Sequence, residues 1–301
     1  LARRDKGRHI VTSAVEHPAV LEVCRYLETM GFTLTVVPVD AYGVVDLPAL
    51  KKALTPETTL ISVMHANNEV GTVQPVEEIA GIARERGMVF HTDAAQTAGK
   101  IPVSVKKLGV DLLSLAGHKI YAPKGVGALY VKGGVALERF MHGAGHEGGR
   151  RAGTENVASI VALGTACELA KRNLKKNAAR MKETRDRLRA GLAERVEDLR
   201  FNGHPERCLP NTLSVSFRGI DAGTLLSHMR RVAVSAGAAC HGASLEISSV
   251  LKAMKVPVEY ARGTVRFSTG KMTTAVEIDE AVRAVAGAVK KIRKTQTFTG
   301  D

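Results

Sequence analysis

Apolar runs alternate with amphipathic stretches over the first half of the chain. Runs rich in apolar and β-branched residues predict strands at 9–13, 33–39, 59–64, 88–93, 111–115 and 126–131. Helical periodicity fills several of the intervals, at 18–30, 47–54 and 76–86. Strands that alternate with helices are typical of a mostly parallel sheet covered by helices on both faces. The pattern therefore predicts an α/β domain.

The pattern changes after a glycine-rich stretch at 143–153. A long helix or a helix pair is expected at 157–196. Beyond it, strands are expected at 212–217, 232–235 and 265–268, and helices at 223–231 and 276–292. We therefore expect a large domain at 1–172 and a smaller α+β domain at 173–301.

Two polar clusters directly follow apolar runs of the predicted sheet. HTDAAQ occupies 91–96 and AGHK occupies 116–119. Open parallel sheets bind ligands at the carboxyl ends of their strands, where Asp93 and Lys119 are expected. A carboxylate facing a pyridine nitrogen and a lysine carrying an aldehyde as a Schiff base are what pyridoxal phosphate requires. The clusters predict a pyridoxal phosphate site, and Asp93 also suits the N-cap of the turn that follows it.

Four further side chains are candidates for ligand contacts. His17 opens a predicted helix and either stacks on a flat ring or packs against the protein. Asn68 follows a strand, where its amide can bind a ring substituent. Arg266 lies in an alternating strand and needs an anionic partner, which is either a substrate carboxylate or a structural carboxylate. Cys240 lies in a predicted mobile loop of small residues, from which a thiol can reach into a site.

Composition narrows the class of protein. The chain has 301 residues, 45% of them hydrophobic, and a formal net charge of +13. Ten Lys and Arg against three acids lie at 171–195, which predicts the solvated basic face of a helix. Aromatic residues, on which bases stack, make up only 4% and Trp is absent, so we expect no nucleic acid as the main partner. The positive charge favours acidic protein partners instead. No apolar run approaches the ~20 residues of a membrane span, so no membrane partner is expected.

The cysteines and the first residues bear on compartment and length. The four cysteines, Cys24, Cys167, Cys208 and Cys240, are too widely spaced to indicate a zinc site or a disulfide framework. A reducing, cytoplasmic compartment is expected. The polar, basic first residues lead us to expect no secretory signal, and the start at Leu1 just before a strand predicts that the chain is cut from something longer.

Taken together, the motifs resemble those of the cysteine desulfurases of the NifS/IscS type. These enzymes belong to the class-V aminotransferases, which have the aspartate-aminotransferase-like fold of fold-type I. The resemblance extends over essentially the whole chain, and its motifs are TSAVEH at 12–17, MHANNEVG at 64–71, HTDAAQ at 91–96, GHKIY at 117–121, the stretch 146–154, the stretch 235–246 and VRFS at 265–268. It implies a pyridoxal phosphate enzyme that converts L-cysteine to L-alanine.

The resemblance implies specific roles around the cofactor. Lys119 would carry the Schiff base, and His118 would be a proton-transfer group or cofactor contact. Asp93 would pair with the pyridine nitrogen and Gln96 with the ring hydroxyl oxygen. His17 would stack on the ring.

It implies further roles at the substrate and at a partner subunit. Asn68 would contact both cofactor and substrate, and Arg266 would bind the substrate carboxylate. Thr154 would reach the cofactor phosphate of a second copy, which implies a homodimer. Cys240 would be the nucleophile, and it would carry a persulfide to an acceptor such as an iron–sulfur scaffold protein. Its one possible metal role would be transient ligation of iron–sulfur through this persulfide.

Three departures from the family pattern keep alternatives open. Ala116 stands where the family often has a phosphate-binding Ser. AACH at 238–241 is closer to selenocysteine lyases, which act on the selenium analogue. The family's N-terminal segment, with a Gly-Ala-Thr phosphate loop, does not occur in this sequence. The alternatives are therefore a selenocysteine lyase and, of another class, a truncated non-catalytic binding or regulatory relic.

Overall fold

The computed structural model describes residues 1–241 and 244–297, without the side chains of 238–246 and 296–297. The chain forms two compact units, which are described separately. The first unit comprises Leu1–Pro38, Val45–Ala66 and Gln74–Leu174. The second unit comprises Val39–Val44, Asn67–Val73 and Lys175–Asp301. The segments 39–44 and 67–73, which the sequence places within 1–172, thus belong to the second unit.

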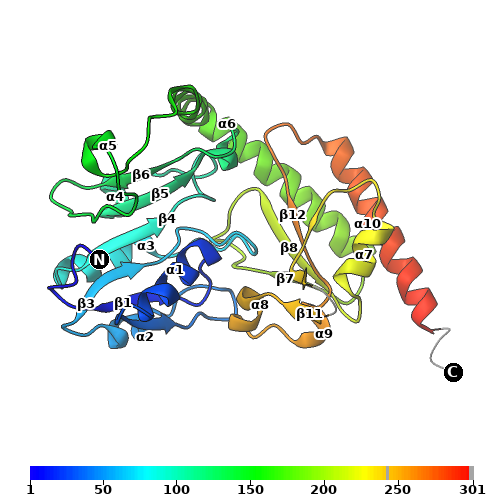
Figure 1. Cartoon of the computed structure of the whole chain (residues 1–301). Coiled ribbons are helices and arrows are strands. Elements are labelled where there is room, and N and C mark those ends of the chain that lie inside the picture. Colours follow the sequence, from blue (N-terminus) through cyan, green and yellow to red (C-terminus); the bar gives the residue numbers. More distant parts are fainter. Residues whose placement is uncertain (242–243, 298–301) are drawn as a thin grey trace. The chain divides into compact units, whose positions relative to one another are not determined.

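The first unit is built on a six-stranded sheet (Figure 1). Its strands follow the order β2-β1-β3-β4-β5-β6, and β6 alone among them runs antiparallel to its neighbour. The strands are β1 (His9–Ser13), β2 (Thr33–Val37), β3 (Thr58–Ser62), β4 (Val89–Asp93), β5 (Leu112–Ala116) and β6 (Gly127–Val131). The predicted mostly parallel α/β sheet is confirmed, because parallel neighbours require the crossovers that the helical stretches supply.

Helices of the first unit connect and cover these strands. They are α1 (Pro18–Glu28), α2 (Leu47–Ala53), α3 (Val76–Glu85), α4 (Val105–Leu108), the 3₁₀ helix η1 (Gly117–Ile120) and α5 (His146–Gly149). Caps fix where they begin: Asp46 accepts a hydrogen bond from the Ala49 amide, and Pro18 and Pro48 occupy first-turn positions that need no amide donor. The core of the sheet contains the fully buried Val11, Ile61 and Phe90, as a sheet covered by helices requires.

The second unit has an antiparallel sheet of order β7-β8-β12-β9. These strands are β7 (Leu199–Asn202), β8 (Thr212–Phe217), β9 (Ser235–Ala236) and β12 (Thr264–Ser268), and a separate hairpin consists of β10 (Ala238–His241) and β11 (Ser244–Ile247). The helices are α7 (Ala222–His228), α8 (Ser249–Ala253), α9 (Val258–Ala261), α10 (Ala275–Thr297) and the second part of α6 (Val157–Arg195). Leu192 of α6, Val215 and Phe217 of β8 and Val285 of α10 meet in one buried core.

The structure decides between expected alternatives in one place and differs from the expected elements in others. Of the long helix or helix pair expected at 157–196, the structure has the single helix α6 at 157–195, which runs through the boundary between the units. The strand expected at 232–235 is confined to Ser235 and Ala236, because only these residues pair with β12. The loop expected around Cys240 is a hairpin in which Cys240 pairs with Leu245. In the described part of the chain, no helix is long and apolar enough to cross a membrane.

Candidate active site

Asp93 and Lys119 follow neighbouring parallel strands of the first unit. Asp93 ends β4 and is paired with Ser114 of β5. Strand β5 ends at Ala116, and Lys119 lies on η1 immediately beyond it. The Asp93 carboxylate also accepts a hydrogen bond from the Ala95 amide, at 2.8 Å, so it caps the turn as well. The structure thus places the carboxylate and the exposed lysine at the same edge of the sheet.

The backbone of η1 is held tightly against the start of β6. The Gly117 amide donates to the Val126 carbonyl at 2.9 Å, and the Ala122 amide donates back to the Gly117 carbonyl at 3.1 Å. A Cβ on residue 117 would lie 2.7 Å from the Val126 carbonyl oxygen, so only glycine fits this approach. Gly117 therefore fixes the position from which Lys119 projects.

The other predicted cofactor residues of the first unit lie on turns and helix starts. His17 is the N-cap of α1, where its Nδ1 accepts from the Ala19 amide at 3.1 Å. Because His17 is exposed, the packing interpretation of this side chain does not hold. His118 is exposed on η1, Gln96 lies three residues after Asp93, and Thr154 is exposed beyond α5.

Glu16 is a buried carboxyl group that the sequence did not single out. Its Oε1 accepts hydrogen bonds from the Ser13 hydroxyl at 2.6 Å and the Met64 amide at 2.8 Å. Its Oε2 is buried and has no hydrogen-bond partner among the described residues. Burial raises the pKa of Glu16 to about 8, and the negative charge of Asp93 acts in the same direction. A neutral carboxyl group thus directly precedes His17.

Buried basic groups surround the same strand ends. The Lys100 ammonium donates to the Gln96 carbonyl at 2.7 Å, and burial followed by the charge of Lys119 lowers the Lys100 pKa to about 8. Burial lowers the pKa of His65 to about 4 and also lowers that of His91. The sequence offers no signal for these shifts, because burial of a charged residue depends on the packing of distant segments.

In the second unit, Arg266 is held by two polar groups. Its Nη1 donates to the Asn68 carbonyl at 2.8 Å and its Nη2 to the Ser235 hydroxyl at 2.9 Å. Its Nε is buried and has no partner among the described residues. Within the described part of the chain no carboxylate pairs with Arg266, so the structural ion pair that the sequence allowed is not found there.

Cys240 lies on β10, and its side chain is outside the described part of the chain. The other three cysteines are free thiols: Cys24 is buried, Cys167 is half-buried, and Cys208 accepts a hydrogen bond from Arg185 Nη1 at 3.0 Å. Among the described residues, no group of three His, Cys, Asp or Glu side chains could hold a metal ion. The role of Cys240 in iron–sulfur ligation stays a prediction.

The groups of the first unit fit pyridoxal phosphate. A carboxylate and an exposed primary amine on adjacent strand ends match a pyridinium nitrogen and an aldehyde. At the phosphate, Ala116 offers no hydroxyl donor where a serine would offer one.

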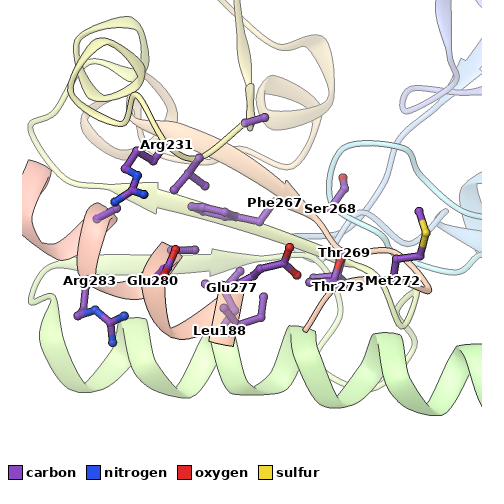
Figure 2. A pocket seen from close by; sticks show the side chains of 15 residues that line it. Leu188, Arg231, Phe267, Ser268, Thr269, Met272, Thr273, Glu277, Glu280 and Arg283 are labelled. Carbon is purple, nitrogen blue, oxygen red and sulfur yellow. The ribbon is translucent and has the colours of Figure 1, made fainter. Parts of the chain in front are cut away.

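A cavity of about 790 Å³ in the second unit is a different feature (Figure 2). Phe267 lines it and belongs to the buried core of that unit. None of the residues predicted for the site lines this cavity.

Comparisons with known proteins agree with the geometry. The aminotransferase class-V family matches residues 1–281. The chain is 47% identical over 295 residues to a cysteine desulfurase IscS of Dictyoglomus turgidum, covering 97% of this chain and 75% of that protein. It is 45% identical to a cysteine desulfurase IscS of Methanosarcina thermophila, covering 99% and 74% respectively. The chain thus spans about three quarters of these relatives.

Solved structures show the same similarity. A NifS-like protein superposes with a TM-score of 0.89 at 39% identity, covering 96% of this chain and 76% of that one. A structure described as SspA in complex with cysteine gives a TM-score of 0.75 at 34% identity, covering 90% of this chain and 76% of that one. Both similarities extend over both units of the chain.

Proposed function

This chain belongs to the class-V aminotransferase family and within it to the pyridoxal phosphate-dependent cysteine desulfurases of the IscS/NifS type, and we propose that it turns L-cysteine into L-alanine while Cys240 receives the sulfur. The observation that carries this proposal is the placement of Asp93 and Lys119 at adjacent ends of the parallel strands β4 and β5. The 34%-identical SspA structure, which is a complex with cysteine, supports the choice of substrate.

In the first unit, Lys119 would hold the cofactor aldehyde and Asp93 the pyridine nitrogen. When bound, the cofactor withdraws electrons from the substrate Cα through its protonated ring. Lys119 would then move the Cα proton, with the exposed His118 beside it as a second proton carrier. His17 would stack on the ring and Gln96 would contact the ring hydroxyl oxygen. The Lys100 ammonium donates a hydrogen bond to the backbone carbonyl of Gln96.

In the second unit, Arg266 and Asn68 would hold the substrate. The guanidinium is oriented by the Asn68 carbonyl and by Ser235 and has no carboxylate partner among the described residues. A substrate carboxylate supplies the missing anion and gains charge-assisted hydrogen bonds. The Asn68 side chain would contact both substrate and cofactor.

The sulfur transfer needs no outside oxidant. The Cys240 thiolate attacks the sulfur of the bound cysteine and forms the S–S bond of a persulfide, while the Cβ–S bond of the substrate breaks. The electron pair of that bond stays on the carbon skeleton, which takes up a proton and leaves as alanine. The persulfide then passes to an acceptor, for which we propose an iron–sulfur scaffold protein.

The assembly is part of the same proposal. Thr154 would reach the cofactor phosphate of a second copy, so the active form would be a homodimer. The exposure of Thr154 supports this arrangement. Its cytoplasmic location stays a prediction from the wide spacing of its cysteines.

Replacement of the nucleophile tests the reaction. Cys240→Ser removes the sulfur acceptor, so alanine and sulfide formation from cysteine should fall to background in the presence of added pyridoxal phosphate. Cys208→Ser, which changes a thiol held by Arg185, should keep wild-type turnover. Unchanged turnover in the Cys240→Ser variant would exclude Cys240 as the nucleophile.

Replacement of the lysine tests the cofactor site. Lys119→Ala should lose the visible absorption band of bound pyridoxal phosphate, whereas Lys107→Ala, an exposed lysine on α4, should keep it. A wild-type chain that shows no such band would favour the non-catalytic alternative. Faster turnover of selenocysteine than of cysteine would favour the selenocysteine lyase.

A further inference from the structure

The turn at 67–73 is a rigid part of the second unit. Asn67 is buried, and its side-chain oxygen accepts from the amides of Glu69 and Val70 at 2.8 and 2.9 Å. The Leu209 amide donates to the Gly71 carbonyl at 2.8 Å and ties the turn to the segment before β8. Because the Asn68 carbonyl orients Arg266, this turn and β12 form one substrate-holding frame.

The hairpin that carries Cys240 is fixed to this frame at its base. At one end, the Gly237 amide donates to the Thr264 carbonyl of β12 at 2.7 Å, and a Cβ on residue 237 would lie 2.8 Å from the Thr264 methyl group. At the other end, the Ser248 amide donates to the Gly237 carbonyl at 3.2 Å. The Ser248 hydroxyl donates to Glu69 Oε2 at 2.5 Å. Glu69 directly follows Asn68 in the turn.

We propose that Glu69 and Ser248 are positioning residues that set the register of the Cys240 hairpin against the Asn68–Arg266 pair, and so control sulfur transfer. This inference rests on the proposed function. The hydrogen bond from Ser248, at the base of the hairpin, to Glu69, next to Asn68, would fix the position of the nucleophile relative to the substrate. A small displacement of a reacting group slows its reaction without loss of binding. The contact therefore acts on the transfer step and leaves cofactor and substrate binding unchanged.

Variants of Ser248 separate this role from helix capping. Ser248 is also the N-cap of α8, where its hydroxyl accepts from the Val250 amide at 3.1 Å. Ser248→Ala removes both contacts. Ser248→Asp keeps a cap acceptor but replaces the donor to Glu69 with a carboxylate. Asp221→Ala removes the corresponding N-cap of α7, in the same unit, and serves as the matched control.

Variants of Glu69 test the other partner of the hydrogen bond. Glu69→Gln keeps an oxygen that accepts from Ser248, whereas Glu69→Ala removes it. We expect kcat for alanine formation to fall by about tenfold to a hundredfold in Ser248→Ala, Ser248→Asp and Glu69→Ala. KM for cysteine and the absorption of the bound cofactor should not change. Glu69→Gln and Asp221→Ala should stay within about twofold of wild type.

Three results would overturn the proposal. The first is wild-type kcat in Ser248→Ala. The second is wild-type kcat in Ser248→Asp, which would leave only the helix cap. The third is a rise in KM at constant kcat, which would assign the contact to substrate binding.

A chemical measurement tests the register without turnover. Iodoacetamide alkylation of Cys240, followed by mass spectrometry and scaled to Cys208 of the same chain, should be about threefold faster in Ser248→Ala and Glu69→Ala than in wild type. Glu69→Gln and Asp221→Ala should match wild type. If wild type makes no alanine, the proposed function fails, but the labelling rates still test whether Glu69 and Ser248 position the hairpin. Equal labelling rates in all variants would reject that positioning role.

Discussion

Single residues around the strand ends of the first unit take their properties from burial. Asp93 and Lys119 could be predicted from the sequence, because each is polar and directly follows an apolar run. Glu16 and Lys100 could not, because a charged residue next to a turn is usually solvated. Glu16 follows β1 and Met64 follows the neighbouring strand β3, and the buried carboxyl group of Glu16 accepts hydrogen bonds from the Ser13 hydroxyl and the Met64 amide.

The raised pKa of Glu16 predicts a pH-dependent stability. In the folded chain the pKa of Glu16 rises from 4.5 to about 8. The contribution of Glu16 to the free energy of unfolding is therefore fully present below pH 4.5 and is lost as pH rises through 8. Glu16→Gln keeps a neutral side chain at every pH. Relative to wild type, its free energy of unfolding should therefore be higher at pH 9 than at pH 5, by about 4 kcal/mol.

Chemical unfolding at pH 5, 7 and 9 measures this difference. Glu22→Gln, which changes an exposed carboxylate on α1, should show the wild-type pH dependence. The same dependence in Glu16→Gln as in wild type would mean that Glu16 is charged in the folded chain.

Elements with apolar, β-branched runs were predictable, and elements of small residues were not. The six strands of the first unit match six apolar runs to within a few residues. The hairpin of β10 and β11 was missed because AACH has no alternation of large apolar and polar residues, and backbone bonds at Gly237 and Ser248 close its base. Strand β7 was missed because it is four residues long, begins soon after the long helix α6 and is defined by its pairing with β8.

The close packing of the short helix η1 predicts that cofactor binding is sensitive to substitution of Gly117. Gly117→Ala places a methyl group 2.7 Å from a backbone oxygen of the segment before β6, and such overpacking costs about 1–3 kcal/mol. Since η1 carries Lys119, we expect the affinity for pyridoxal phosphate to fall by about tenfold or more. Titration followed by visible absorption measures this affinity.

A second glycine provides the control for this substitution. Gly81→Ala on α3 meets no atom within 4 Å and gains helix propensity, so cofactor affinity should be unchanged. Equal affinities in the Gly117→Ala variant and wild type would show that η1 tolerates displacement.

At the scale of the whole molecule, the residues proposed for the site are divided between the two units. Lys119, Asp93 and the other residues proposed to bind the cofactor, except Asn68, belong to the first unit, whereas Arg266 and Cys240 belong to the second. The turn at 67–73 leaves β3 of the first unit and joins the second, which no local pattern could predict. Its hydrogen bonds to Arg266, to Ser248 and to the segment before β8 tie it to the second unit.

The proposed dimer predicts that two defective variants complement each other. In a homodimer each site would use Lys119 of one chain and Thr154 of the other. A mixed dimer of Lys119→Ala and Thr154→Ala chains then contains one site with both residues intact and one site with neither. Chains unfolded together and refolded as mixed dimers should regain about half of the wild-type activity per mixed dimer, above the mean of the two separate variants.

This complementation distinguishes a shared site from a self-contained one. If Thr154 acted within its own chain, the Lys119→Ala site would stay inactive and the Thr154→Ala site would stay impaired in every dimer. The mixed sample would then show only the mean of the two variants. A double variant that carries both changes on one chain, mixed with wild type, provides the matched control. If the sites are shared, each site of the mixed dimer carries one of the two defects. If each chain works alone, the mixed dimer keeps one intact site.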